Sequence, residues 1–168
     1  MTLGPTEPFD GARHASTFAC GEPALDTWLR AHAGQSQRRD AARTFVAVDQ
    51  GLVAGYYTLV ATVIEHAGAT PAARRGLARH FPSPAALITR LAVDRPCQGR
   101  GLGRSLLLDA LQRVLRAADE VAIRAVLVHA KTPAAASFYA RYGFEPSGID
   151  TLTLMIPLAV VRATLHGG

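Results

Sequence analysis

The chain has 168 residues, of which 49% are hydrophobic and 18% charged, and its formal net charge is +5. This composition is typical of one globular domain, residues 1–168, and it excludes a disordered chain. No apolar run reaches the length of about 18 residues that a membrane span needs. Residues 1–8 lack the basic and apolar regions of a signal peptide. Two cysteines are too few for a disulfide framework. We therefore expect a cytoplasmic protein without membrane contact and without a metal site.

Arginine dominates the positive charge, with 17 arginines and a single lysine, Lys131. The arginines are unevenly spread, because residues 30–43 hold four against one acidic residue and residues 74–104 hold seven against one. Arginine is well suited to binding phosphate through two parallel hydrogen bonds. The surplus indicates a polyanionic partner such as RNA, and the alternative is a solvated basic surface.

Hydrophobic periodicity and turn residues predict helices and strands in mixed order, with hairpins first and a β-α-β unit later, which favours an α+β (mixed α/β) fold. The expected elements, in chain order, are a helix over 23–32, a second short helix over 35–42, strands over 44–48 and 52–61 joined by a hairpin turn at 49–51, a short basic helix over 71–79, a strand over 85–93, a helix over 102–118, a strand over 123–130, a helix over 133–142, and a final strand over 151–156 followed by residues 158–165.

The turn between the strand 85–93 and the helix 102–118 is the most informative segment. Gln98, Gly101 and Gly103 stand there at Q-x-x-G-x-G spacing, between Arg100 and Arg104. Glycines let the backbone approach an anion, and the helix N-terminus behind them adds the positive end of the helix dipole. The segment therefore predicts a diphosphate site, with a plain connecting turn as the alternative. A nucleotide P-loop would need a lysine at the helix start, and a dinucleotide-binding turn would need a third glycine.

Two motifs in this order resemble the GNAT superfamily of acetyl-CoA-dependent N-acetyltransferases. Residues 98–103 are similar to its R/Q-x-x-G-x-G/A pyrophosphate loop, and residues 138–144 are similar to its F-Y-x-x-x-G-F motif. The resemblance implies an N-acetyltransferase with a central mixed, mostly antiparallel twisted sheet of about six to seven strands and about four flanking helices. It implies acetyl-CoA contacts at Leu91, Ala92, Val93, Gln98, Gly99, Arg100, Gly101, Leu102, Gly103, Arg104, Thr132 and Phe138. Thr132 departs from the asparagine that related sequences often carry there.

Tyr139 is the candidate general acid, because the resemblance directs its hydroxyl to the thioester sulfur and a phenol can protonate a thiolate leaving group. A purely structural aromatic is the alternative, and Tyr142 lies close by in the sequence. The general base stays open between Glu65, His66 and His129, and an amine of low pKa needs none.

The N-terminal half narrows the resemblance. The patterns in residues 18–29, 44–46, 55–59 and 90–94 are similar to the tRNA-acetylating toxins of bacterial type II toxin–antitoxin modules. This implies acetylation of the α-amino group of aminoacyl-tRNA, which blocks translation, a ribbon-helix-helix antitoxin, and a homodimer. The candidate tRNA contacts are Arg30, Arg38, Arg39, Arg43, Arg74, Arg75, Arg79 and Arg90. The alternatives are an acetyltransferase for a small-molecule or protein amine, and a catalytically silent coenzyme-binding regulatory module.

Overall fold

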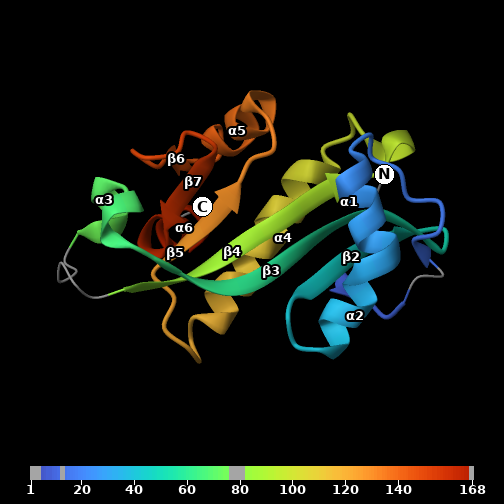
Figure 1. Cartoon of the computed structure of the whole chain (residues 1–168), viewed down its shortest axis with the longest axis horizontal. Helices are drawn as coiled ribbons and strands as arrows, with labels where there is room; N and C mark the ends of the chain where they lie inside the picture. Colours follow the sequence, from blue (N-terminus) through green and yellow to red (C-terminus); the bar gives the residue numbers. More distant parts are fainter. Residues whose placement is uncertain (1–4, 12–13, 76–81, 167–168) are drawn as a thin grey trace. The chain divides into compact units, whose positions relative to one another are not determined.

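The computed structural model describes residues 5–11, 14–75 and 82–166 (Figure 1). The chain divides into two compact units. The first comprises Met1–Val60 with Thr89–Ala110, and the second comprises Ala61–Ile88 with Leu111–Gly168. A single domain over 1–168 stays a prediction. None of the helices in the described ranges is long and apolar enough to cross a membrane.

The first unit begins its helical part with α1 (Pro23–Thr27), a wider π-helical turn (Trp28–His32) and α2 (Ala33–Arg38). Pro23 suits the first helical position. Leu25, Leu29 and Ala33 recur every four residues and are buried in one core cluster with residues of β2 (Arg43–Asp49) and β3 (Leu52–Ile64). The second helix was predicted over 35–42, which is wrong at its end. Asp40 adopts a left-handed φ of 56° and the Ala41 N–H turns back to the Ser36 carbonyl, so the helix ends at Arg38.

The strands of the first unit are β1 (Glu7–Pro8), β2 (Arg43–Asp49) and the first part of β3 (Leu52–Ile64), all antiparallel neighbours in this order. The hairpin between β2 and β3 is confirmed, with left-handed φ angles of 51° at Gln50 and 78° at Gly51. The sequence reading missed β1, because two residues show no periodicity. The unit also contains the end of β4 (Ser83–Val93) and the start of α4 (Leu102–Ala117).

The second unit contains the first part of β4, which pairs in parallel with β5 (Ala125–His129). β5 pairs antiparallel with β7 (Thr153–Pro157), and β7 pairs antiparallel with β6 (Glu145–Pro146). The helices α3 (Pro71–Arg74), α5 (Pro133–Ala140) and α6 (Leu158–His166) all contact β7 (Figure 1). Its core contains Leu127 and Met155.

Across the described residues, the strand order is β1-β2-β3-β4-β5-β7-β6, with one parallel neighbour, β4 and β5, among the pairings given above. The predicted mixed, mostly antiparallel sheet of six to seven strands is therefore confirmed. Several boundaries differ: β3 runs three residues beyond 61, β4 begins two residues before 85, β5 is shorter than the predicted 123–130, α5 ends two residues before 142, and β7 begins two residues after 151. Residues 158–165, for which the sequence predicts no element type, lie in the helix α6. The predicted helix over 71–79 extends into residues 76–79, which lie outside the described residues, and α3 itself covers Pro71–Arg74.

Candidate functional site

The glycine-rich loop lies in the first unit, between the end of β4 and the start of α4. A short 3₁₀ turn at Arg95–Cys97 leads into it. Gly99 and Gly101 have φ angles of +78° and +83°, which a residue with a side chain adopts only with strain. Nothing lies within 4 Å of a Cβ built at either position, so the backbone conformation, and not space, requires glycine there.

The backbone N–H groups of this loop can receive an anion. The Gln98 N–H donates to the Arg95 carbonyl, and the first hydrogen bond of α4 is donated by the Ser105 N–H to the Gly101 carbonyl. Between these two, residues 99–104 have no backbone acceptor in the part of the chain that the structure describes. Arg100 and Arg104 are exposed on the same segment. Six free donors and two guanidinium groups at the N-terminus of a long helix fit a diphosphate.

Hydrogen bonds to a distant segment hold the loop in place. The Gln98 side-chain amide donates to the carbonyls of Cys20 (2.8 Å) and Val93 (2.9 Å). The Arg95 N–H donates to the Ala19 carbonyl at 3.0 Å, and the Asp94 carboxylate accepts from the Ala19 N–H at 2.9 Å. Gln98 therefore positions the loop through its side chain, a role that sequence reasoning missed because its partner lies 78 residues away.

Gly55 in β3 is a second positioning residue that the sequence did not reveal. A Cβ at this position would lie 2.8 Å from the Leu106 Cδ1 atom, 3.1 Å from the Ala92 carbonyl oxygen and 3.3 Å from the Leu102 Cδ2 atom. Leu102 begins α4 and Ala92 lies in β4, so β3 supports both elements that flank the loop. Of the strand residues predicted to bind coenzyme, Ala92 is buried, whereas Leu91 and Val93 are half-buried.

Tyr139 lies in α5 of the second unit, within an aromatic cluster. Its ring centroid is 5.2 Å from that of Phe138 and 5.6 Å from that of Phe144, and Phe138 also contacts Tyr142 at 5.2 Å. The Tyr139 side chain is 7% exposed, and burial raises its pKa to about 12. The hydroxyl therefore keeps its proton throughout the physiological pH range, which is the state that a general acid requires.

Thr132 has a structural role that the sequence reading did not predict. Its hydroxyl oxygen accepts the Ala135 N–H at 3.1 Å, so Thr132 is the N-cap of α5, with Pro133 in the first helical position. The hydroxyl hydrogen is still able to donate to a ligand.

The three candidate bases also belong to the second unit. Glu65 and His66 lie at the short 3₁₀ turn after β3, where the structure gives their side chains no hydrogen bond to a described residue. His129 ends β5, and its Nδ1 atom lies 3.0 Å from the Thr153 hydroxyl, which donates to the Asp150 carboxylate at 2.8 Å. The Leu152 N–H and the Thr153 hydroxyl lower the pKa of Asp150, which favours its ionised form.

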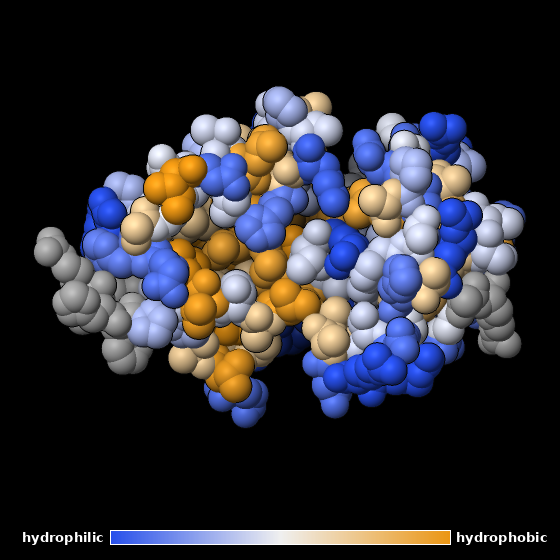
Figure 2. Space-filling model, viewed as in Figure 1, coloured by the Kyte–Doolittle hydropathy of each residue, from blue (hydrophilic) through white to orange (hydrophobic). Residues whose placement is uncertain are grey.

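The predicted tRNA contacts in the first unit are exposed, apart from Arg90. Arg38, Arg39 and Arg43 are exposed between the end of α2 and the start of β2, and Arg30 is exposed on the π-helical turn. Figure 2 shows hydrophilic surface over the region of α2. Arg43 forms an ion pair with Asp40 at 2.5 Å and donates a hydrogen bond to the Gln37 carbonyl at 2.8 Å, so the Asp40 carboxylate partly compensates its positive charge. The structure thus brings three of the candidates together.

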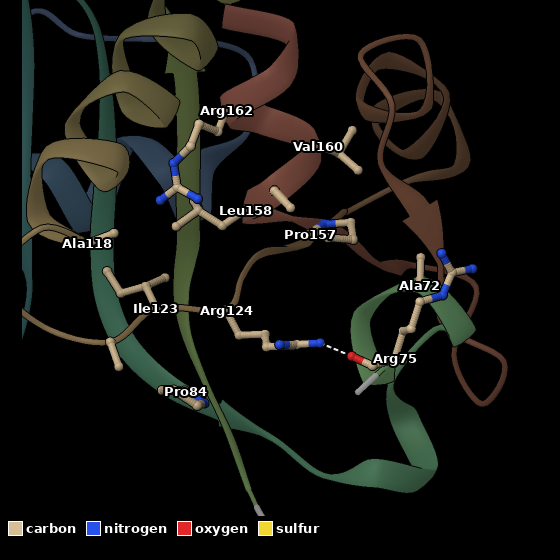
Figure 3. Close-up of a pocket in the computed structure, with 12 residues that line it drawn as sticks. Ala72, Arg75, Pro84, Ala118, Ile123, Arg124, Pro157, Leu158, Val160 and Arg162 are labelled. Atoms are coloured by element: carbon tan, nitrogen blue, oxygen red, sulfur yellow. Dashed lines mark hydrogen bonds between the residues drawn. The ribbon is translucent and has the colours of Figure 1, made fainter. Parts of the chain in front are cut away.

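The other candidates belong to the second unit. Arg74 is half-buried and Arg75 exposed, and Arg79 lies outside the described residues. The Arg75 side chain lines a largely apolar cavity of about 640 Å³ at α3 and α6 (Figure 3). Arg124 donates to the carbonyls of Ala73 and Arg75 at one side of this cavity, so its guanidinium anchors α3.

Neither cysteine is poised as a nucleophile. Burial and a hydrogen bond to Asp26 raise the pKa of Cys20 to about 11. Burial and the nearby Asp94 carboxylate raise the pKa of Cys97. Both thiols therefore stay protonated near neutral pH.

Comparison with known proteins agrees with this geometry. The family of the acetyltransferase (GNAT) domain matches residues 40–146. A tRNA-acetylating toxin of Mycobacterium tuberculosis is 42% identical over 154 residues, which are 92% of each chain. The solved structure of AtaT complexed with acetyl-methionyl-tRNAfMet has a TM-score of 0.87 at 28% identity and covers 98% of this chain and 99% of that chain. A mutant AtaT toxin bound to acetyl-CoA and the C-terminus of the antitoxin AtaR has a TM-score of 0.82 at 28% identity, with 97% and 98% covered.

The loop that fits a diphosphate and the aromatic cluster around Tyr139 lie in the two motifs on which the resemblance was based. The family match spans well over half of the chain, and the relative from M. tuberculosis is similar over nearly its full length. The chain therefore belongs to the GNAT acetyltransferase family and is an N-acetyltransferase related to the tRNA-acetylating toxins of toxin–antitoxin systems.

Proposed function

We propose that this enzyme is a toxin that transfers the acetyl group of acetyl-CoA to the α-amino group of aminoacyl-tRNA and thereby blocks translation. The observation that carries the proposal is the loop from Gly99 to Arg104, whose free N–H groups and arginines fit the diphosphate of the coenzyme. The similarity to a tRNA-acetylating toxin and to AtaT complexed with acetyl-methionyl-tRNAfMet supports the choice of acceptor.

Acetyl-CoA, when bound, supplies the acetyl group as a thioester. The N–H groups of residues 99–104 would hold its diphosphate, together with Arg100 and Arg104. The backbone of Leu91–Val93 would hold the pantetheine arm. Thr132 and Phe138 remain proposed coenzyme contacts in the second unit, with the Thr132 hydroxyl hydrogen as the available donor.

Tyr139 would donate its phenolic proton to the sulfur atom as the carbon–sulfur bond breaks. Among the described residues, every side-chain N or O atom that is fully buried has a hydrogen-bond partner. The Tyr139 hydroxyl has no partner there, so the oxygen atom itself is not fully buried and can be reached from solvent, although the residue as a whole is 7% exposed. A phenol with a pKa of about 12 is protonated before the reaction, so its proton is present when negative charge develops on the sulfur.

His129 is the base that we favour to accept the proton of the attacking amine. Because the Thr153 hydroxyl gives its single hydrogen to Asp150, it must accept a hydrogen bond from the His129 Nδ1–H. This assigns the proton to Nδ1 and leaves the lone pair of Nε2 able to take a proton. The α-amine of an aminoacyl ester has a low pKa, so the contribution of this base would be modest.

The tRNA backbone would contact the exposed Arg30, Arg38 and Arg39, with smaller contributions from Arg43, Arg74 and Arg75. Arg79 stays among the proposed contacts. Since charged tRNA is a cytoplasmic molecule, we place the enzyme in the cytoplasm.

The proposed partners are an antitoxin of the ribbon-helix-helix class and a second copy of the chain. The related AtaT mutant toxin binds the C-terminus of the antitoxin AtaR, which supports an antitoxin partner. The antitoxin class and the homodimer rest on the resemblance in the sequence. Light scattering of the purified enzyme tests the dimer.

The decisive experiment incubates the enzyme with radiolabelled acetyl-CoA and total aminoacylated tRNA. We expect label on charged tRNA, no label on deacylated tRNA, and strong loss of label with Tyr139→Phe. Absence of label on tRNA, with transfer to a small-molecule or protein amine, would establish the alternative acceptor and reduce the arginines to a solvated surface. A coenzyme-binding module without any acetyl transfer would contradict both.

A further inference from the structure

Arg90 has an unusual environment in the first unit. Its guanidinium carbon lies 4.1 Å from the centroid of the Trp28 ring, and the Trp28 ring stacks on Tyr56 with centroids 6.2 Å apart and planes at 14°. Tyr56 is fully buried, and its hydroxyl donates to the Leu25 carbonyl at 2.8 Å. A rigid aromatic platform therefore holds the Arg90 side chain in one orientation.

The charge of Arg90 has no counterion within the described ranges of the chain. No carboxylate there lies within ion-pair distance, and the only hydrogen bond of the guanidinium is one of 3.3 Å to the Thr89 hydroxyl. The side chain is half-buried, and this burial lowers the pKa of Arg90. Partial burial of a cation is unfavourable unless an anion compensates it, and a guanidinium has five N–H donors to offer.

The position of Arg90 connects it to substrate binding. It directly precedes the strand residues 91–93 and lies on the same strand that leads into the glycine-rich loop, whereas Trp28 belongs to the helical segment that also carries Arg30 and Arg38. A guanidinium that is fixed at this place, with no carboxylate partner in the described part of the chain, is suited to a phosphate group.

We propose that Arg90, whose guanidinium lies over the Trp28 ring, binds a phosphate of the acceptor end of tRNA and so selects a nucleic-acid acceptor over a free amine. This inference rests on the proposed function. The coenzyme also carries phosphates, and the two sources of phosphate are separated by the experiment below.

The experiment compares Arg90→Gln and Arg90→Lys with the wild-type enzyme and with Arg116→Gln, which removes an exposed arginine from the last turn of α4. Binding of deacylated tRNA is measured by fluorescence anisotropy at several salt concentrations. Acetylation is measured on aminoacyl-tRNA and on a phosphate-free aminoacyl nucleoside, and KM is determined for acetyl-CoA. Circular dichroism and thermal melting check the fold of each variant.

For Arg90→Gln we expect the affinity for tRNA to fall about 10- to 100-fold. The slope of log affinity against log salt concentration should become shallower by about one, which corresponds to the loss of one phosphate contact. Turnover of the aminoacyl nucleoside and KM for acetyl-CoA should stay within about twofold, because neither uses the lost contact. The tRNA affinity of Arg90→Lys should lie between those of the wild-type enzyme and Arg90→Gln, since lysine keeps the charge and loses the planar fork. Arg116→Gln should reduce affinity by less than Arg90→Gln.

Three results would overturn the inference: a raised KM for acetyl-CoA, which would assign Arg90 to a coenzyme phosphate; equal losses of acetylation on both acceptors; or an unchanged salt slope in Arg90→Gln. A wild-type enzyme that binds tRNA through Arg90 and does not acetylate charged tRNA would refute the proposed function alone. If Arg90→Gln fails to fold, Arg90→Lys decides through its affinity for tRNA: the inference expects this affinity to fall while KM for acetyl-CoA stays unchanged, and an unchanged tRNA affinity would overturn it.

Discussion

Replacing Gly55 by alanine tests whether close packing beneath α4 shapes the coenzyme loop. The new Cβ would lie 2.8 Å from the Leu106 Cδ1 atom and 3.1 Å from the Ala92 carbonyl oxygen. Leu106 is 1% exposed and the second neighbour is backbone, so neither atom moves away freely. We expect β3 and α4 to separate slightly, which displaces both flanks of the loop.

The magnitude follows from two opposing effects. Overpacking of a well-packed core costs about 1–3 kcal/mol. The lower entropy of the unfolded chain returns about 0.4–1 kcal/mol when glycine becomes alanine. The net result is a loss of about 1–2 kcal/mol in the free energy of unfolding, and a protein of this size then melts about 2–8 °C lower. KM for acetyl-CoA should rise, because the backbone donors of the loop are displaced from the diphosphate.

The matched control is Gly148→Ala. Gly148 is exposed, and nothing lies within 4 Å of a Cβ built there, so this variant keeps the entropic gain without the clash. Urea unfolding and steady-state kinetics on both variants give the comparison. If Gly55→Ala is as stable as Gly148→Ala and keeps the wild-type KM for acetyl-CoA, the packing argument is refuted.

Four further predictions concern Gln98 in the loop, the proposed acid Tyr139 and the thiol of Cys20. Gln98→Ala should lower the free energy of unfolding by about 1–2 kcal/mol through its two lost hydrogen bonds, and it should raise KM for acetyl-CoA. An unchanged KM in steady-state assays would show that the loop keeps its conformation without the Gln98 side chain. Tyr139→Phe should lower kcat at least about 100-fold with an unchanged melting temperature at neutral pH. The pKa of Tyr139 is raised from 10.0 to about 12, so between these pH values the folded state keeps a proton that the unfolded state loses. The free energy of unfolding therefore declines as the pH rises from 10 to about 12. Alkaline unfolding curves of Tyr139→Phe should show a smaller decline. Alkylation of Cys20 at pH 8 should be about 100-fold slower in the native than in the denatured protein, since its pKa rises from 9.0 to about 11; rapid labelling of the native thiol, followed by mass spectrometry, would contradict this.

Local patterns predicted most of the secondary structure and the diphosphate loop. The run of leucines at helical spacing predicted a helix over 102–118, and α4 covers 102–117. The hairpin turn at 49–51 and the mixed, mostly antiparallel sheet were also predicted correctly. These features depend on residues that are near one another in the chain, so periodicity and turn chemistry reveal them.

Boundaries and positioning contacts were decided by the tertiary structure. The two-residue strands β1 and β6 exist only because β2 and β7 offer them partners. The helix predicted to reach residue 42 ends at Arg38, where the left-handed Asp40 turns the chain.

The sequence by itself determined the kind of chemistry. The glycine spacing at 98–103 and the motif around Tyr139 are local and specific enough to indicate an acetyl-CoA-dependent enzyme. Only the tertiary structure showed that Gln98 is hydrogen-bonded to Cys20, that Gly55 supports α4, and that Arg90 lies on Trp28 without a counterion among the residues that the structure describes. The physical reason is that these contacts join residues dozens of positions apart, where neither propensity nor periodicity carries information about the neighbour.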